Sequence, residues 1–404
     1  MKINKVNYSS LPIIMLSMSR WDSEFSSASI SLAKEFSKSN KVFYIDNPFT
    51  IKDFILEFNS PKIKHRRRAL LFGKQIYRPI IQGSDNLIAV TPKLVSPINW
   101  LPKGSLYKWF SRVNNKVIIA SIRKILKDFS IKDYILFNSF NPFYGIDIPR
   151  DIRPIISIYQ SRDDISESPY VKKHGIIMEN RAISQADYVF ATSLGLIKKI
   201  APDDKKIHYL PNAAEVSIFN ESFSKLKRPR ELENIKDKKI IGYTGNICHR
   251  INYDLLKTIA ENNLDKIILL VGPINNQAFF NMRLNKMPNI ITTGPKSIYD
   301  LPAYLKYIDC AIIPFLCNEL TKSIYPLKIN EYLAAGRPVV STSFSEDLRS
   351  FKKVIYLSRN EKDFLGNINQ AINEDNEDKV QERTLFAKDN TWENRVKLFW
   401  NLVN

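Results

Sequence analysis

The chain has 404 residues, of which 44% are hydrophobic, so it is long enough to form two domains with packed cores. Its formal net charge is +19, and most of this charge lies in residues 1–220. That half has 33 Lys and Arg against 19 Asp and Glu, a net charge of +14. Residues 221–404 have 27 Lys and Arg against 22 Asp and Glu, a net charge of +5. No run of about 18 apolar residues suits a membrane span, and Cys248, Cys310 and Cys317 lack metal-ligand spacing and indicate buried thiols in a reducing cytoplasm.

Apolar runs alternate with helical patterns through the first half, which is the order that builds parallel sheets. Helices are predicted at residues 27–37 and 112–128, the second with Val113, Val117, Ala120 and Ile125 toward the core. The strands of this half are predicted at residues 13–16, 42–45, 134–137, 155–159, 188–191 and 207–210. We therefore expect a Rossmann-like domain over residues 1–220, whose first short apolar stretch is a buried strand and not a signal peptide.

The densest basic run follows the second predicted strand and contains Lys62, Lys64, His65, Arg66, Arg67 and Arg68. Such a cluster gains about 1 kcal/mol per basic residue near an anionic leaflet, so an anionic membrane surface is an expected partner of the first domain. The alternative is a solvated loop. Nucleic acid is not an expected partner, because no groove-binding motif and no interleaved aromatic residues accompany the charge.

A polar segment over residues 221–239, with Pro229, is the predicted linker. The pattern then restarts as a second Rossmann-like domain over residues 240–388, with strands at 240–243, 267–271, 290–292, 310–314, 339–340 and 354–357. Ligands of such doubly wound sheets lie beyond the carboxyl ends of the strands, so two domains facing across a cleft are expected to bind a ligand there. No Gly-x-Gly-x-x-Gly follows the first strand and no Gly-Lys-Ser/Thr is present, which argues against a dinucleotide oxidoreductase and a P-loop NTPase.

The most informative stretch is residues 321–341, with the sequence TKSIYPLKINEYLAAGRPVVS. Pro326 can open a helix, Gly336 can end it, and a buried strand follows. The open N-terminus of this helix is suited to phosphate, and Lys322 and Lys328 add positive charge nearby. Glu331 lies one turn further in, where a carboxylate can accept hydrogen bonds from the hydroxyls of a sugar. Phosphate beside ribose indicates a nucleoside diphosphate.

This stretch resembles the donor-binding signature of GT-B glycosyltransferases, most closely those of glycosyltransferase family 4. The signature has Glu, seven residues, a second Glu, and then Ala-x-Gly-x-Pro-Val. Glu331 and residues 335–339 match the second half, whereas Ser323 stands where the first Glu belongs. The resemblance implies that Glu331 holds the ribose and leaves the role of Ser323 open. The alternative is an ordinary helix–turn–strand unit with a surface Glu.

Further segments resemble the same family in the same order along the chain. They are residues 187–193, 209–214, 242–246, 271–273, 293–295, 301–305, 309–314 and 392–395. The last resembles the final helix of the family, so residues 389–404 are expected to pack back on the N-terminal domain. The subgroup that the chain resembles most makes bacterial surface polysaccharides such as capsule, lipopolysaccharide or teichuronic acid.

The expected donor site lies in the second domain. Gly245 and Asn246 follow its first strand, where glycine lets the backbone approach a phosphate, and Arg250 and Lys328 are expected to neutralise the diphosphate. By resemblance the turn at residues 294–298, with Lys296 and Ile298, contacts the nucleobase through backbone groups, and uridine or guanosine remain alternatives. The expected donor-binding set is completed by Lys322, Ser323, Tyr325, Leu327 and Glu331.

In the first domain, Arg20 and Trp21 follow the first strand and are expected to meet the acceptor. Asp163 and Asp164 follow a later strand and are candidates for orienting or deprotonating the acceptor hydroxyl. The alternative for this pair is a helix N-cap, because Asp caps well. His174 and His249 are single histidines, expected to be structural or exposed.

No metal cluster and no cofactor are expected, since helix ends, Arg250 and Lys328 can stabilise a departing diphosphate without metal. The sequence therefore predicts a glycosyltransferase that moves a sugar from a UDP- or GDP-sugar to a glycan or lipid-linked acceptor, at the inner face of the cell membrane. Family 4 implies that the anomeric configuration is retained. The alternatives are a nucleotide-sugar epimerase on the same scaffold, which the scarcity of histidine disfavours, and a non-catalytic basic protein that binds membrane or nucleic acid.

Overall fold

The computed structural model describes residues 8–23, 27–167, 169–200, 206–235 and 237–404. The chain folds into two units, each with its own sheet: unit 1 is Met1–Pro211 with Val396–Asn404, and unit 2 is Asn212–Arg395. The boundary therefore lies at Pro211 and not at the predicted residue 220. The predicted linker at 221–239 belongs to unit 2, because it forms the short 3₁₀ helices Glu221–Phe223 and Arg230–Leu232 and buries Leu232 completely.

Unit 1 is built on an eight-stranded sheet in the order β3-β4-β2-β1-β5-β6-β7-β8. Every neighbouring pair is parallel except β3 and β4. The strands are β1 Ile13–Ser17, β2 Val42–Ile45, β3 Tyr77–Pro79, β4 Leu87–Val90, β5 Ile135–Ser139, β6 Ile156–Ser161, β7 Tyr188–Ala191 and β8 Ile207–Tyr209. The chain reverses its direction of travel across the sheet between β1 and β5, and ligands of such sheets lie beyond the strand ends at this point.

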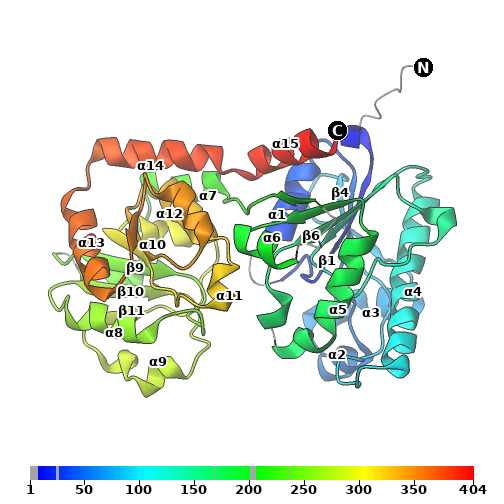
Figure 1. The fold of residues 1–404 in the computed structure, drawn as a ribbon, viewed down its shortest axis with the longest axis horizontal. Helices are drawn as coiled ribbons and strands as arrows, with labels where there is room; N and C mark the ends of the chain where they lie inside the picture. Colours follow the sequence, from blue (N-terminus) through cyan, green and yellow to red (C-terminus); the bar gives the residue numbers. More distant parts are fainter. Residues whose placement is uncertain (1–7, 24–26, 168, 201–205, 236) are drawn as a thin grey trace. The chain divides into compact units, whose positions relative to one another are not determined.

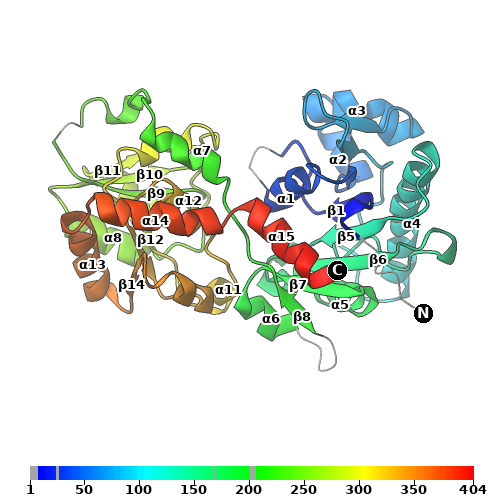
Figure 2. The same cartoon turned by 90° about the horizontal axis from the view of Figure 1, so that it is seen from above.

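Helices lie on both sides of this sheet (Figures 1 and 2). They are α1 Ala28–Phe36, α2 Ile51–Leu56, α3 Pro61–Phe72, α4 Ser105–Asp128, α5 Pro169–Gln185, α6 Leu194–Ile200 and the end of α15 Trp392–Val403. Phe399 of α15 is fully buried and packs its ring on Phe36, Phe137 and Phe190. The last residues of the chain are therefore part of the core of unit 1. Among the described residues, no helix is long and apolar enough to cross a bilayer.

Unit 2 is built on a six-stranded sheet, parallel throughout, in the order β11-β10-β9-β12-β13-β14. Counted from its first strand, this order is 3-2-1-4-5-6, the order of dinucleotide-binding Rossmann folds. The strands are β9 Ile240–Thr244, β10 Ile267–Val271, β11 Ile290–Thr292, β12 Cys310–Ile313, β13 Val339–Thr342 and β14 Tyr356–Ser358. The two predicted Rossmann-like α/β domains are thus confirmed.

The helices of unit 2 are α7 Val216–Asn220, α8 Tyr253–Glu261, α9 Ala278–Asn281, α10 Leu301–Leu305, α11 Glu319–Lys322, α12 Leu327–Ala334, α13 Glu361–Asn373 and α14 Glu377–Asp389. The helix predicted in the 321–341 stretch is α12. Ile329, Leu333 and Ala334 are completely buried, as the helical spacing predicts. Gly336, at φ +70°, ends the helix, and Pro326 is the residue before its first turn.

Some expectations about burial and local structure were wrong. The buried face of α4 is formed by Asn114, Asn115, Ile118 and Ile122, while Val113 and Ala120 are exposed. The basic run lies on α3, which Ser60 caps by accepting the Ile63 N–H at 3.2 Å, so the alternative of a loop does not hold. Cys248 and Cys310 are buried as expected, but Cys317 is exposed.

Candidate functional site

The sheet of unit 2 reverses between β9 and β12, and the loops that leave these strands are tied together at this edge. The loop after β9 pairs with the loop after β10, since Ile247 N–H donates to the Pro273 carbonyl at 2.9 Å. It also pairs with the loop after β12, since Leu316 N–H donates to the Arg250 carbonyl at 2.8 Å. Residues 245–250 are therefore held by backbone hydrogen bonds where ligands of this sheet type lie.

Lys328, in the first turn of α12, lies directly against Gly245. A Cβ atom on Gly245 would be 2.1 Å from Lys328 Nζ and 2.5 Å from Cε. The backbone of Gly245 has φ +129°, a value that residues other than glycine rarely adopt. Gly272 also lies against this backbone, because a Cβ atom on Gly272 would be 2.0 Å from the Gly245 carbonyl oxygen. The structure therefore brings together the two residues that the sequence assigned to the diphosphate, an ammonium group and a bare stretch of backbone.

Two tyrosines outside the predicted donor-binding set, Tyr243 and Tyr332, support the position of Lys328 beside Gly245. The Lys328 ammonium is 5.6 Å from the centre of the Tyr243 ring, within the range of a cation–π interaction. Tyr332 OH, completely buried, accepts a hydrogen bond from Thr244 N–H at 2.9 Å and so ties α12 to the end of β9. Because Lys328 and Tyr332 lie one turn apart on α12, this bond fixes where the ammonium group stands.

The other two charged residues of the site are Glu331 and Arg250. Glu331 is half-buried, and burial raises the pKa of its carboxyl group while the positive charge of Lys328 opposes that shift. Arg250 lies close enough to Tyr243 to affect its pKa. Burial raises the pKa of the Tyr243 hydroxyl, and the positive charge of Arg250 lowers it. Arg250 Nε is buried without a hydrogen-bond partner among the described residues. The carboxyl end of β9 therefore has two positively charged side chains, Lys328 and Arg250, and one carboxyl group, Glu331, close to it.

Four other predicted donor residues lie in the loops after β9 and β11 and on the short helix α11 after β12. Asn246 is exposed and its side-chain oxygen accepts a hydrogen bond from Asn275 at 3.0 Å. Lys296 is bound by Glu231 at 2.8 Å, and this hydrogen bond raises the pKa of the lysine. Ile298 is partly buried against the core. Lys322 is exposed and forms an ion pair with Glu319 on its own helix.

The remaining three predicted donor residues precede or open α12. Tyr325 is a core residue, with its ring next to Phe351 and its hydroxyl accepting a hydrogen bond from Asn330 at 3.1 Å. This placement turns Tyr325 away from a ligand and makes it a support for α12. Ser323 is buried at the end of α11, and Leu327 is half-buried at the start of α12.

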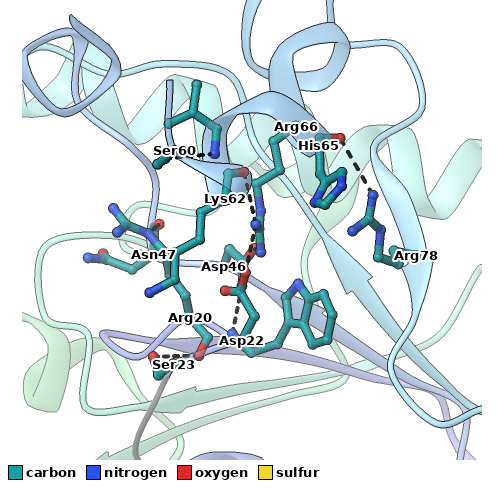
Figure 3. A network of polar contacts seen from close by, with 12 residues as sticks. Arg20, Asp22, Ser23, Asp46, Asn47, Ser60, Lys62, His65, Arg66 and Arg78 are labelled. Atoms are coloured by element: carbon teal, nitrogen blue, oxygen red, sulfur yellow. Dashed lines mark hydrogen bonds and ion pairs between the residues drawn. The ribbon is translucent and has the colours of Figure 1, made fainter. Parts of the chain in front are cut away.

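In unit 1, Arg20 and Trp21 follow β1 as predicted. Arg20 lies in a polar network with Asp46, Asn47 and Arg66 (Figure 3). The Arg20 guanidinium lies 3.5 Å from the centre of the Phe49 ring and donates through Nε to the Asn47 carbonyl at 3.1 Å. Trp21 N–H donates to Asp46 Oδ1 at 3.0 Å. Burial lowers the pKa of Arg20 and raises the pKa of Asp46 to about 6.

Arg66 of α3 holds this loop from the other side. Its Nη1 donates to Asp22 Oδ2 at 2.8 Å and its Nη2 to Asp46 Oδ2 at 3.3 Å. Both Arg66 and Asp46 are buried, so the pair is shielded from solvent. Removing one partner from such a pair would leave a buried charge uncompensated. Asp46 and Arg66 are thus positioning residues for the Arg20–Trp21 loop.

The carboxylates of Asp163 and Asp164 differ in their surroundings. Asp164 is buried, accepts hydrogen bonds from Ser166 N–H at 3.0 Å and Ser166 OH at 2.6 Å, and pairs with Lys199. These contacts fit the capping interpretation, since Asp164 precedes the 3₁₀ helix Ile165–Glu167. Asp163 is exposed. His174 is structural, stacked on Tyr107 at 3.5 Å and bonded to the Leu101 carbonyl, and His249 is exposed.

Residues 238–374 match the family model described as Glycosyl transferases group 1. A curated relative, the putative teichuronic acid biosynthesis glycosyltransferase TuaH of Bacillus subtilis (strain 168), is 30% identical over 184 residues, which is 44% of this chain and 46% of the relative. The match therefore spans about half the length of each protein.

Solved structures resemble the chain over almost its entire length. A sucrose-phosphate synthase from Thermosynechococcus elongatus has a TM-score of 0.68 and 12% identity, with 97% of this chain and 98% of that chain covered. HepE from Anabaena, in complex with UDP and glucose, has a TM-score of 0.63 and 12% identity, with 97% and 99% covered. The chain thus has the GT-B fold of these solved structures, and its residues 238–374 are similar to the group 1 glycosyl transferases.

Proposed function

We propose that the chain transfers a glycosyl group from a nucleoside diphosphate sugar to an acceptor hydroxyl in the synthesis of a bacterial surface polysaccharide. The observation that carries this proposal is the contact between the Lys328 ammonium group and Gly245 at the carboxyl ends of β9 and β12. An ammonium group beside open backbone is a binding site for the two phosphates of a nucleotide. The TuaH relative and the UDP complex of HepE support this choice of substrate class.

Lys328 and Arg250 stabilise the negative charge that develops on the departing diphosphate. Fixed charges of this kind are effective because they need no reorganisation during the reaction, and Tyr332 and Tyr243 keep Lys328 in place. Glu331 accepts hydrogen bonds from the ribose hydroxyls. The transfer proceeds without a metal ion and with retention of configuration, through an oxocarbenium-like state screened by the leaving phosphate.

Unit 1 supplies the acceptor side, where Arg20 and Trp21 lie beyond β1. Asp163 is the exposed carboxylate on this unit that we assign to orienting the acceptor hydroxyl. We place the protein in the cytoplasm, on the inner face of the cell membrane, where a lipid-linked glycan is accessible. Capsule and lipopolysaccharide synthesis are, with teichuronic acid, the polysaccharide pathways that fit this chemistry.

The test is a panel of UDP- and GDP-sugars scored by the shift in unfolding temperature. A donor at about 100 times its Kd should stabilise the protein by about 2.7 kcal/mol. The shift should vanish in Lys328→Ala and persist in Lys257→Ala, an exposed lysine on α8 that forms an ion pair with Glu261. The absence of any shift across both nucleotide series would refute the proposed function.

A further inference from the structure

The helical hairpin formed by α2 and α3 exposes an unusual number of large apolar side chains. We call residues 51–78 the basic hairpin. Its two helices lie side by side in both views of unit 1 (Figures 1 and 2). Phe54, Ile63 and Leu70 fill its inner side by packing against Phe49. The outward side chains therefore have no core to enter, and those of Ile51, Ile55, Leu56, Phe58, Leu71 and Phe72 are exposed.

The exposure is large enough to require an explanation. Leu56 is 72% exposed, and Ile55 and Phe72 are 67% exposed each. Single exposed apolar residues are ordinary on a protein surface, but six within 22 consecutive residues are a concentration of the kind that marks an interaction site.

Positive charge surrounds these apolar side chains. The basic hairpin contains 8 Lys and Arg residues and 2 Asp and Glu residues, a net charge of +6. Asp53 is occupied within the fold, since it completes the cap of α2 with Thr50. Arg67 spreads over the Phe58 ring at 4.0 Å. The basic side chains that reach solvent are Lys52, Lys64, His65, Arg68, Lys74 and Arg78.

Arg66 is the exception in the basic run, because it points inward and is only 4% exposed. Its bonds to Asp22 and Asp46 tie α3 to the loop after β1 (Figure 3). The basic hairpin is consequently held in place by these bonds, and they join it directly to the Arg20–Trp21 loop, the candidate acceptor loop.

Exposed aromatic residues are also present on segments linked to the hairpin by hydrogen bonds. Ile51 N–H donates to the Val95 carbonyl at 2.9 Å. This bond joins α2 to residues 95–100, which we call the Trp100 segment. Lys173 Nζ in turn donates to the Trp100 carbonyl at 2.9 Å. Trp100 is 72% exposed, and Trp109 and Tyr170 are also exposed. Tryptophan and tyrosine are the residues favoured at the boundary between lipid and water.

We propose that the basic hairpin and the Trp100 segment dock unit 1 on an anionic lipid bilayer, with the apolar side chains among the lipid headgroups and the lysines and arginines on lipid phosphates. This inference rests on the proposed function and deepens it, because docking through α3 brings the Arg20–Trp21 loop to an acceptor that is itself anchored in lipid. Amphipathic surfaces that combine buried apolar area with charge bind anionic interfaces in this way. Aliphatic side chains such as Ile55 and Leu56 offer no flat ring for nucleobases, so a nucleic acid is disfavoured.

The test measures sedimentation of the full chain with two kinds of vesicle, phosphatidylcholine alone and phosphatidylcholine mixed with phosphatidylglycerol. Binding should require phosphatidylglycerol and weaken as salt rises. The double variant Leu56→Ser/Phe72→Ser should reduce the partition coefficient by at least about tenfold. Lys64→Gln and Arg68→Gln should reduce it by about fivefold each.

Matched controls lie on exposed positions of unit 2. Leu385, on α14, is 66% exposed, and Leu385→Ser should leave vesicle binding unchanged, as should Lys362→Gln and Lys388→Gln. Wild-type protein that ignores anionic vesicles, hairpin variants that bind like wild type, or hairpin-dependent binding to duplex nucleic acid without vesicle binding would each overturn the proposal. The nucleotide-sugar shift measured on the same samples separates this failure from failure of the proposed function, since none of these substitutions touches unit 2 around Lys328.

Discussion

Replacing Gly245 by alanine should disable the donor site while leaving the protein folded. The new Cβ would stand 2.1 Å from Lys328 Nζ and 2.5 Å from its Cε, distances that no pair of non-bonded atoms tolerates. Lys328 has a flexible end, so it will move. The ammonium group then leaves the position beside the backbone of residue 245, and the new methyl group occupies part of the space for the phosphates.

Two magnitudes follow from this geometry. Alanine at φ +129° is strained, which should lower the free energy of unfolding by about 1–3 kcal/mol. Loss of one preorganised donor to a developing oxyanion costs about 10²–10³ in rate, so kcat/KM for the donor should fall by at least about a hundredfold. Chemical denaturation measures the first effect, and release of the nucleoside diphosphate measures the second.

Two other glycines separate strain from crowding. Gly294 has φ +70° but no atom within 4 Å of a Cβ, so Gly294→Ala should show strain without displacement of Lys328. Gly366 lies inside α13, has ordinary helical geometry and equally open surroundings, so Gly366→Ala should raise stability by about 0.5–1 kcal/mol and keep full activity. Gly245→Ala with wild-type kcat/KM, or Gly366→Ala with the same loss, would refute the reasoning.

Three further predictions concern single side chains. Lys328→Ala should lower kcat/KM about a hundredfold with little change in unfolding, and equal activity in Lys328→Ala and Lys257→Ala would contradict the role of Lys328. Tyr332→Phe removes the acceptor for the buried Thr244 N–H and should lower the free energy of unfolding by about 1–3 kcal/mol; an unchanged denaturation midpoint would contradict this. Burial raises the pKa of Glu179 from 4.5 to about 7, so the folded protein holds this proton more tightly than the unfolded chain does, and stability is lost as pH rises from about 4.5 to 7. Glu179→Gln should therefore match wild type near pH 4 and exceed it by up to about 3 kcal/mol near pH 8, and a difference independent of pH would exclude this assignment.

The sequence predicted α12 and its surroundings in unit 2 well because their signals are local. Pro326 and Gly336 mark the two ends of α12, and the spacing of Ile329 and Leu333 defines its buried face. Once the strand order is known, the residues that follow a strand must lie at one edge of a parallel sheet. That is why Gly245 and Lys328 could be assigned to one site although they lie far apart in the chain.

The sequence could not predict which polar residues would be buried. Asn114 and Asn115 face the core from α4 because each bonds to the backbone of a distant loop, Asn114 to Ser96 and Asn115 to Ile146. Arg66 is one of several basic residues in a row, and only Asp22 and Asp46, brought close by the fold, distinguish it. Helical periodicity ranks side chains by polarity, so it cannot recognise a polar group whose partner comes from elsewhere in the chain.

Both units hold the chain at or just after their first strand by a side chain that accepts a backbone N–H, but this side chain is a neutral hydroxyl in unit 2 and a carboxylate in unit 1. In unit 2 the backbone N–H of Thr244 donates to a neutral acceptor, the Tyr332 hydroxyl, and the charge of Lys328 acts on the carboxyl group of Glu331. In unit 1 the backbone N–H of Trp21 donates to a carboxylate.

That carboxylate, Asp46, belongs with Asp22 and Asp53 to a network in which each aspartate pairs with Arg20 or Arg66. Because Arg20 and Arg66 are already paired with carboxylates, we expect a dianionic diphosphate to gain less from them than from Lys328 in unit 2. This contrast supports the proposed assignment of the donor to unit 2 and of the acceptor to unit 1. Asp46→Asn should weaken this separation by making the loop of unit 1 more positive, and inhibition by free nucleoside diphosphate, measured against wild type, should then strengthen; unchanged inhibition would show that these charges do not decide where the donor binds.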